Sequence, residues 1–173
     1  AAHPVSGMNK PEANTLGGAL AEAAFLTGVE RNADVVVLAS YAPLFARAGF
    51  AQWSPDMIWF DEKRAYGTPS YYVQKMYGEN MGTVTVPMDG QEKELREQGI
   101  YVNLSLEERT GELIVKAVNY NDEEKPLTPA LSGEREVCGP VTLQVLAGEK
   151  DAYNTVENPD AVTPQKKETG YTG

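Results

Sequence analysis

The stretch that most constrains the fold is residues 14–43, where a helical pattern leads directly into a run of β-branched residues. Apolar or small residues recur through residues 16–24 at the spacing of one helix face, and Asn14 can cap the start of that helix. Residues 35–39, Val-Val-Val-Leu-Ala, follow without polar alternation, which is typical of a strand covered on both faces in a parallel sheet. This pair is half of an α/β unit, so the sequence predicts a piece of a larger fold.

A second helix is predicted from Thr68, which is a good N-cap and precedes a proline at the first helical position. Its apolar residues fall on one face over residues 72–77. Between the two helices, residues 42–56 form a long connection that is broken by prolines and a glycine. This connection leaves the C-terminal end of the predicted strand, which is where ligands bind in parallel α/β folds and barrels. We therefore expect ligand-contacting residues in it.

After residue 82 the hydrophobic pattern changes from a helical period to alternation. Alternating runs predict strands at residues 83–86, 100–106, 112–120, 127–131 and 141–146. Several short strands separated by turns indicate an antiparallel β-sandwich, and the tail from residue 163 is predicted to be a frayed end. The predicted domains are residues 1–82, which are α/β, and residues 83–173, which are all-β. Nothing disordered separates them, so we expect them to pack on each other.

The chain has 173 residues and a formal net charge of −10, which argues against nucleic acid or an anionic membrane surface as a partner. Cys138 is the only cysteine, so neither an intrachain disulfide nor a thiolate metal cluster can form. His3 is the only histidine, so a metal site would need oxygen ligands, and no Asp-x-Asp-x-Asp-Gly loop is present. No apolar stretch reaches the length of a membrane span. The sequence therefore predicts no metal and no cofactor.

Five separated segments carry a resemblance to a known family. They are NTLGGALAEAAFLTGVERNADVVVLASYAPLF from residue 14, QWSPDMIWFD from residue 52, GTPSYYVQKMYGENMGT from residue 67, GELIVKAVNY from residue 111 and NTVENPDAV from residue 154. Read together, they resemble the C-terminal part of α-L-arabinofuranosidases of glycoside hydrolase family 51. The resemblance implies a retaining glycosidase that releases terminal α-L-arabinofuranosyl groups from arabinan, arabinoxylan or their oligosaccharides. The implied partner is thus an arabinose-containing glycan.

The family fold is a (β/α)8 barrel followed by a jelly-roll-like β-sandwich. The resemblance therefore implies an α+β fragment: the last βα elements of the barrel in residues 1–82, then an antiparallel β-sandwich in residues 83–173. Residues 35–39 would form the eighth barrel strand. This agrees with the doubly covered strand predicted from the residues themselves.

The resemblance also implies that the catalytic residues lie outside this chain. A retaining glycosidase needs two carboxyl groups about 5 Å apart. In the family the acid/base Glu follows an Asn on the fourth barrel strand, and the nucleophile Glu ends the seventh strand. Residues 1–4 look like the continuation just after that nucleophile. We therefore expect both carboxylates upstream of residue 1 and an inactive fragment.

Four residues are candidates for contact with a sugar, and each has a simpler alternative. Trp53 can offer an apolar face and an indole N–H to a sugar ring, or it can pack on the barrel rim. Asp56 can bind sugar hydroxyls, although Ser-Pro-Asp is also ordinary turn chemistry. Tyr41 can face a pocket or be a buried structural residue. His3 would lie at the rim of the site behind the nucleophile, or be an exposed terminal residue.

Two other functions compete with the enzyme fragment. One is a non-catalytic carbohydrate-binding or structural β-sandwich module, and the other is a small independent enzyme, which no nucleophile or metal spacing supports. A barrel strand without its neighbours exposes edges and apolar helix faces, so we expect either a homo-oligomer or repacking of residues 1–82 against the sandwich. The sequence leaves open the preferred linkage and the compartment, whether secreted, periplasmic or cytoplasmic in a bacterium.

Overall fold

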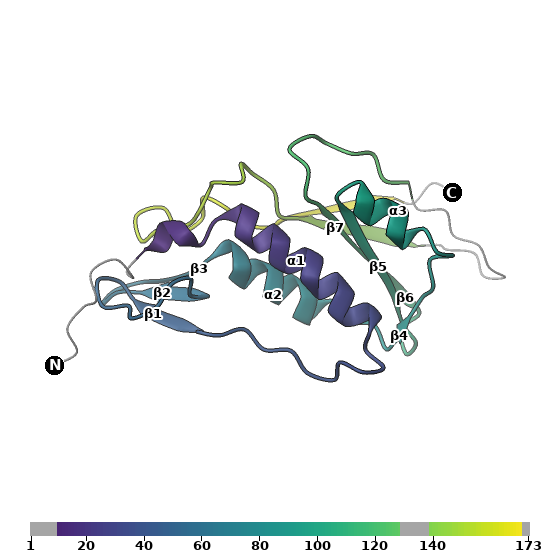
Figure 1. The fold of residues 1–173 in the computed structure, drawn as a ribbon, viewed down its shortest axis with the longest axis horizontal. Helices are drawn as coiled ribbons and strands as arrows, with labels where there is room; N and C mark the ends of the chain where they lie inside the picture. The colour runs from purple at the N-terminus through teal and green to yellow at the C-terminus, as the bar shows by residue number, and fades with distance from the viewer. Residues whose placement is uncertain (1–9, 129–138, 171–173) are drawn as a thin grey trace.

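Two helices lie next to each other along the middle of the molecule, with small sheets towards both ends (Figure 1). The computed structural model describes residues 10–128 and 139–170. The chain enters through a short 3-10 turn, η1 (Pro11–Ala13), and continues into α1 (Leu16–Arg31). The second helix, α2 (Pro69–Glu79), begins at the predicted proline. Both predicted helices are confirmed, and the result is a mixed α+β fold.

The two helix starts are capped by threonines. The Thr68 hydroxyl accepts a hydrogen bond from the Tyr71 backbone N–H at 3.3 Å, as its N-cap position predicts. In α1 the cap is Thr15, whose hydroxyl accepts from the Gly18 N–H at 3.2 Å. The prediction that Asn14 caps this helix is therefore wrong by one residue. Its side chain is buried and bonds elsewhere.

Three short strands form the sheet near the start of α1. They are β1 (Phe45–Arg47), β2 (Ile58–Phe60) and β3 (Ala65–Gly67), with β1 parallel to β2 and β2 antiparallel to β3. Trp59, at the centre of β2, is fully buried against Ala46, Ala51 and Tyr66. β1 lies inside the connection that the sequence predicts as a loop, because three residues are too few for alternation to be recognised.

Residues 35–39 do not form the predicted covered strand. Val35 is 72% exposed, Val37 is 90% exposed and Leu38 is 84% exposed. The backbone of residues 37–39 is extended but makes no hydrogen bond to another described residue. The prediction is wrong for this segment, because none of the three described sheets includes it. The strand that follows it, β1, pairs with β2. The β-branched run therefore lies at the surface without the neighbours that its composition calls for.

The strands predicted at residues 83–86, 100–106 and 112–120 are confirmed as one antiparallel sheet. β4 (Val84–Thr85), β5 (Ile100–Glu107) and β6 (Glu112–Asn119) form one sheet. β5 and β6 are a hairpin that pairs Glu107 with Glu112 next to the predicted turn. A short helix that the sequence pattern does not reveal, α3 (Glu92–Glu97), packs Leu95 against the buried residues of β5.

β7 (Pro140–Val145) pairs with β8 (Gln165–Gly170) in an antiparallel ribbon. The tail from residue 163 is thus not frayed as predicted. Its Lys166-Lys167 pair suggests a solvated end, but the backbone there pairs with the alternating residues of β7. Of the strand predicted at 127–131, residues 127–128 have no regular structure and residues 129–131 lie outside the described residues.

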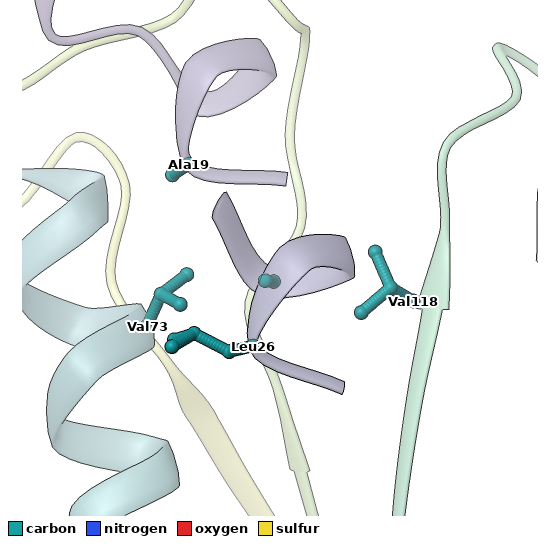
Figure 2. Packing of buried hydrophobic residues seen from close by; sticks show 5 residues of the cluster. Ala19, Leu26, Val73 and Val118 are labelled. Atoms are coloured by element: carbon teal, nitrogen blue, oxygen red, sulfur yellow. The ribbon is translucent and has the colours of Figure 1, made fainter. Parts of the chain in front are cut away.

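The helices pack directly on the hairpin. Leu26 and Val73 face each other between α1 and α2, while Val118 of β6 approaches α1 from its other side (Figure 2). Ala19 and Ala23 complete this buried cluster. The small alanine side chains let α1 approach its neighbours closely. The expectation that the two halves pack on each other is confirmed by this cluster.

The C-terminal part of the chain returns to the start of α1 (Figure 1). The carbonyls of Ala152 and Lys150 accept hydrogen bonds from the N–H groups of Leu16 and Gly17, each at 2.8 Å. These are first-turn donors that have no partner inside the helix. A Cβ added at Gly17 would lie 3.1 Å from the Lys150 carbonyl oxygen, so this close approach favours glycine. No helix in residues 10–128 and 139–170 is long and apolar enough to cross a membrane.

Candidate functional site

The side chain of Asn14 ties the end of the 42–56 connection to β2. Its Nδ2 donates to the Asp56 carbonyl oxygen at 2.8 Å, and its Oδ1 accepts from the Asp56 N–H at 3.4 Å. The same Oδ1 accepts from Trp59 Nε1 at 3.0 Å. All three residues are buried. Because buried polar groups are costly when unpaired, this arrangement fixes where the connection ends.

The carboxylate of Asp56 is the unusual group of this site. Its Oδ2 atom is buried and has no hydrogen-bond partner among the described residues. Burial raises the pKa of this carboxyl above its ordinary value, because the charged form loses solvation. An unpaired buried acceptor is suited to receive a hydrogen bond from a hydroxyl or an N–H that lies outside the described structure.

Tyr41 lies within electrostatic reach of Asp56 and belongs to a second polar group. Burial raises the pKa of the Tyr41 hydroxyl, and the charges of Glu22 and Asp56 raise it further, whereas a hydrogen bond with Ser70 lowers it. Burial also raises the pKa of Glu22, against the opposing hydrogen bonds of Gln74 and Ser70. Residues from α1, α2 and the end of the extended segment thus share one network next to Asp56.

The structure brings two of the four predicted sugar-contacting residues together. Tyr41 and Asp56 lie close enough for their charges to interact. Trp53 lies on the same connection as Asp56, but this residue is 60% exposed and its indole has no hydrogen-bond partner within residues 10–128 and 139–170. His3 lies outside the described residues.

Two members of this site are not predicted from the sequence. Asn14 precedes a helix, which makes a capping role the obvious interpretation. Trp59 belongs to the short apolar run of residues 57–60, which by itself indicates no site. One available signal is the chemistry of tryptophan: a buried indole N–H needs an acceptor, and Asn14 is a nearby polar residue with one.

A cavity lies elsewhere, between β3, the start of α2 and the segment after β7. Its volume is about 390 Å³. It is lined by Ile58, Ala65, Tyr66, Gly67, Tyr71, Tyr72, Pro159 and Asp160. Within the described part of the chain, no three His, Cys, Asp or Glu side chains are grouped so as to hold a metal ion.

A family model for the α-L-arabinofuranosidase C-terminal domain matches residues 5–172, almost the whole chain. This chain belongs to that family. α-L-Arabinofuranosidase 2 of Arabidopsis thaliana is 33% identical over 164 residues, which cover 92% of this chain and 24% of the plant protein. α-L-Arabinofuranosidase A of Aspergillus niger is 35% identical over 86% of this chain and 23% of its own length.

Solved structures support the same membership of the arabinofuranosidase C-terminal domain family. An arabinose-bound GH51 α-L-arabinofuranosidase matches 91% of this chain with a TM-score of 0.81 and 32% identity. The GH51 arabinofuranosidase of Xanthomonas axonopodis pv. citri matches with a TM-score of 0.55 and 17% identity, which shows a likeness of fold alone. The chain spans about a quarter of the length of these first relatives.

Proposed function

We propose that this chain is the C-terminal part of a retaining α-L-arabinofuranosidase that releases terminal arabinofuranosyl groups from arabinan- or arabinoxylan-type glycans. The observation that carries the proposal is the match to an arabinose-bound GH51 enzyme over 91% of the chain with a TM-score of 0.81. Identity of 32% along that length supports a shared chemistry as well as a shared fold.

Residues 1–82 would complete the catalytic barrel, and residues 83–173 would form the sandwich. Support comes from the β-branched segment 35–39, whose residues 37–39 are extended but unpaired in the described structure. Parallel neighbours from the rest of the enzyme would bond its backbone and cover Val37 and Leu38. The sandwich then braces the barrel through the contacts of Val118 with α1.

In this proposal the 42–56 connection contributes to the rim of the sugar site. The unpaired Oδ2 of Asp56 would accept a hydrogen bond from a sugar hydroxyl or from a barrel residue that contacts one. The exposed ring of Trp53 would pack on the apolar face of a sugar. Tyr41 would contribute its hydroxyl next to Asp56, and His3 would lie near the same rim.

The chain on its own should not hydrolyse glycosides. Retention requires two carboxyl groups about 5 Å apart in one site. The large cavity is lined by a single carboxylate, Asp160, and a smaller one by a single carboxylate, Glu79. An isolated chain would also leave the apolar segment 35–39 uncovered, so we propose that it self-associates. Light scattering tests this, and a monomer would contradict it.

Hydrolysis of an aryl α-L-arabinofuranoside tests the function. We expect turnover by the full-length enzyme and none by the 173-residue chain; a full-length enzyme that leaves arabinofuranosides intact would overturn the proposal. In the full-length enzyme, Trp53→Ala should raise KM about tenfold, the scale of one lost ring contact. Phe50→Ala is the matched control, since Phe50 lies in the same connection and is 62% exposed.

A further inference from the structure

The cavity of about 390 Å³ near the start of α2 has the size of a small-molecule site, which is typically about 300–1,000 Å³. Three tyrosines, Tyr66, Tyr71 and Tyr72, line it together with Asp160. The rings of Tyr71 and Tyr72 meet edge to face, with centroids 5.2 Å apart and an interplanar angle of 73°. Ile58 adds an apolar wall.

The walls of this cavity are held in place by buried contacts. Asn154 is fully buried, and its Nδ2 donates to the carbonyls of Gly67 at 2.9 Å and Val162 at 3.0 Å. Its Oδ1 accepts from the Val162 N–H at 2.7 Å. The segment that carries Asp160 is therefore attached to β3. A site that is already formed loses little entropy when it binds a ligand.

The opposite wall is equally constrained. A Cβ at Gly67 would lie 2.1 Å from Cδ1 of Tyr71, so the Tyr71 ring lies directly against the glycine. This contact fixes the ring that lines the cavity. Two independent segments, β3 with α2 and the segment after β7, therefore present fixed aromatic and carboxylate groups to one hollow.

A second, smaller cavity of about 230 Å³ shares Tyr72 with the first as a lining residue. It is lined by Tyr72, Lys75, Met76, Glu79, Gln144, Thr163 and Pro164. Its amide, hydroxyl and charged groups are donors and acceptors suited to hydroxyl groups. The lining residues of the two cavities follow one another along α2 and share Tyr72, and we call the two cavities together the track.

The chemistry of the large cavity disfavours an anion. The large cavity has no lysine or arginine in its lining, and the charges of Asp160 and Glu157 act on Tyr72 and Tyr66. Tyrosine rings offer apolar faces to the C–H groups of a sugar, and a carboxylate accepts hydrogen bonds from its hydroxyls. A neutral polyhydroxylated ring satisfies both kinds of lining group.

We propose that this track is a saccharide-binding site that holds two or three neutral pentose residues of a glycan, with Tyr72 at its centre and Asp160 as the hydroxyl acceptor. The choice of pentose rests on the proposed function. The site itself rests on the two cavities and their lining residues.

The test is a titration of the whole 173-residue chain, followed by amide chemical shifts. The probes are methyl α-L-arabinofuranoside and α-1,5-linked L-arabinotriose. We expect shifts centred on residues 66–76 and 154–164, and tighter binding of the trisaccharide because it reaches both cavities. Shifts confined to other residues, or tighter binding of tetramethylammonium than of either sugar, would overturn the proposal.

Two variants make the test specific. Asp160→Asn should weaken trisaccharide binding about tenfold, since the neutral amide oxygen is a weaker hydrogen-bond acceptor than the carboxylate. Asp151→Asn is its control, because Asp151 is an exposed acid of the same segment and lines neither cavity. Tyr72→Ala should abolish binding, while Tyr120→Ala should not; equal loss in variant and control would refute the site.

The result is independent of hydrolysis. If the full-length enzyme cleaves arabinofuranosides but the chain binds no arabinotriose, this inference fails and the proposed function stands. If the chain binds a xylotriose probe at these residues and the full-length enzyme cleaves no arabinofuranoside, the site stands and the proposed function fails.

Discussion

Asn14 Oδ1 accepts a hydrogen bond from the indole Nε1 of Trp59 at 3.0 Å, across 45 residues of sequence. The same side chain holds both backbone polar groups of Asp56. One buried amide therefore joins the start of α1, the end of the 42–56 connection and the centre of β2. This connection is the part of the chain that the proposed function places at the sugar site.

Replacing Asn14 by Ala should lower the free energy of unfolding by about 2–3 kcal/mol, because a buried indole N–H and a buried carbonyl lose their partners. Urea unfolding of the chain measures the change. Asn158→Ala is the control, since the Asn158 side chain is exposed and makes no hydrogen bond among the described residues. A loss below about 0.5 kcal/mol, the range of ordinary surface changes, would contradict the role given to Asn14.

The buried carboxyl of Asp56 should make stability depend on pH. Its pKa is raised in the fold above the ordinary 3.8, so the folded chain retains a proton that the unfolded chain releases. The resulting stabilisation is complete below pH 3.8 and is lost as the pH rises through the folded pKa. Asp56→Asn should remove this dependence.

The measurement is the unfolding free energy of the chain and of Asp56→Asn from about pH 3 to pH 7. The stability of the unmodified chain relative to the variant should decrease with rising pH. Glu22, whose pKa is also raised by burial, adds a second contribution to stability that likewise decreases as the pH rises. The contribution of Glu22 should remain in Asp56→Asn and disappear when Glu22→Gln is added. A difference that increases with pH would reverse the sign and refute the assignment.

A partly buried ion pair joins the helices to the hairpin. Lys116 of β6 is 10% exposed and pairs with Glu30 at the end of α1, and its Nζ lies 4.5 Å from the centre of the Tyr77 ring. Lys116→Met should cost about 2–3 kcal/mol, because Glu30 is left with an unpaired charge. Adding Glu30→Gln should cost less than the sum of the two single changes.

The exposed pair of Lys93 and Glu97 is the control for this experiment, and Lys93→Met should change stability by less than about 0.5 kcal/mol. Thermal or urea unfolding of the unmodified chain, Lys116→Met, Glu30→Gln and the double variant gives the coupling energy between Lys116 and Glu30. Strictly additive costs for Lys116 and Glu30 would show that the two charges act separately.

Glycine at position 67 is required by the ring of Tyr71. Gly67→Ala should cost about 1–3 kcal/mol, since the new methyl group would overlap that ring. Tyr71→Ala in the same chain should remove the overlap and recover part of the loss. Gly78→Ala is the control: it lies in α2 with open space around it and should stabilise the chain by about 0.5–1 kcal/mol. Equal effects at both glycines would contradict the contact.

The helices were predictable because their signals are local. Thr68 followed by a proline defines the start of α2 without reference to the rest of the chain. The β5–β6 hairpin was predictable for a similar reason, since alternation and a turn glycine lie within one short segment.

Non-local partners were not predictable. Asn14 has the chemistry of a helix cap, and only the return of the chain at Trp59 shows why it is buried instead. Residues 35–39 have the composition of a covered strand, but composition specifies the neighbours that a strand needs and not whether they are present. The candidate site could not be predicted for the same two reasons. Asp56 is buried next to Asn14, which is distant in sequence, and the extended segment brings Tyr41 close to Asp56.

The hydrogen bonds from Leu16 and Gly17 to the carbonyls near Ala152 set an order of events during synthesis. The ribosome makes α1 well before residues 150–152, which supply the acceptors for its first turn. Until then those two amides are hydrated, and the final docking of the helix follows synthesis of the segment around residues 150–152. Removing that segment by proteolysis would return the amides to water and loosen the helix at the end opposite the Glu30–Lys116 pair.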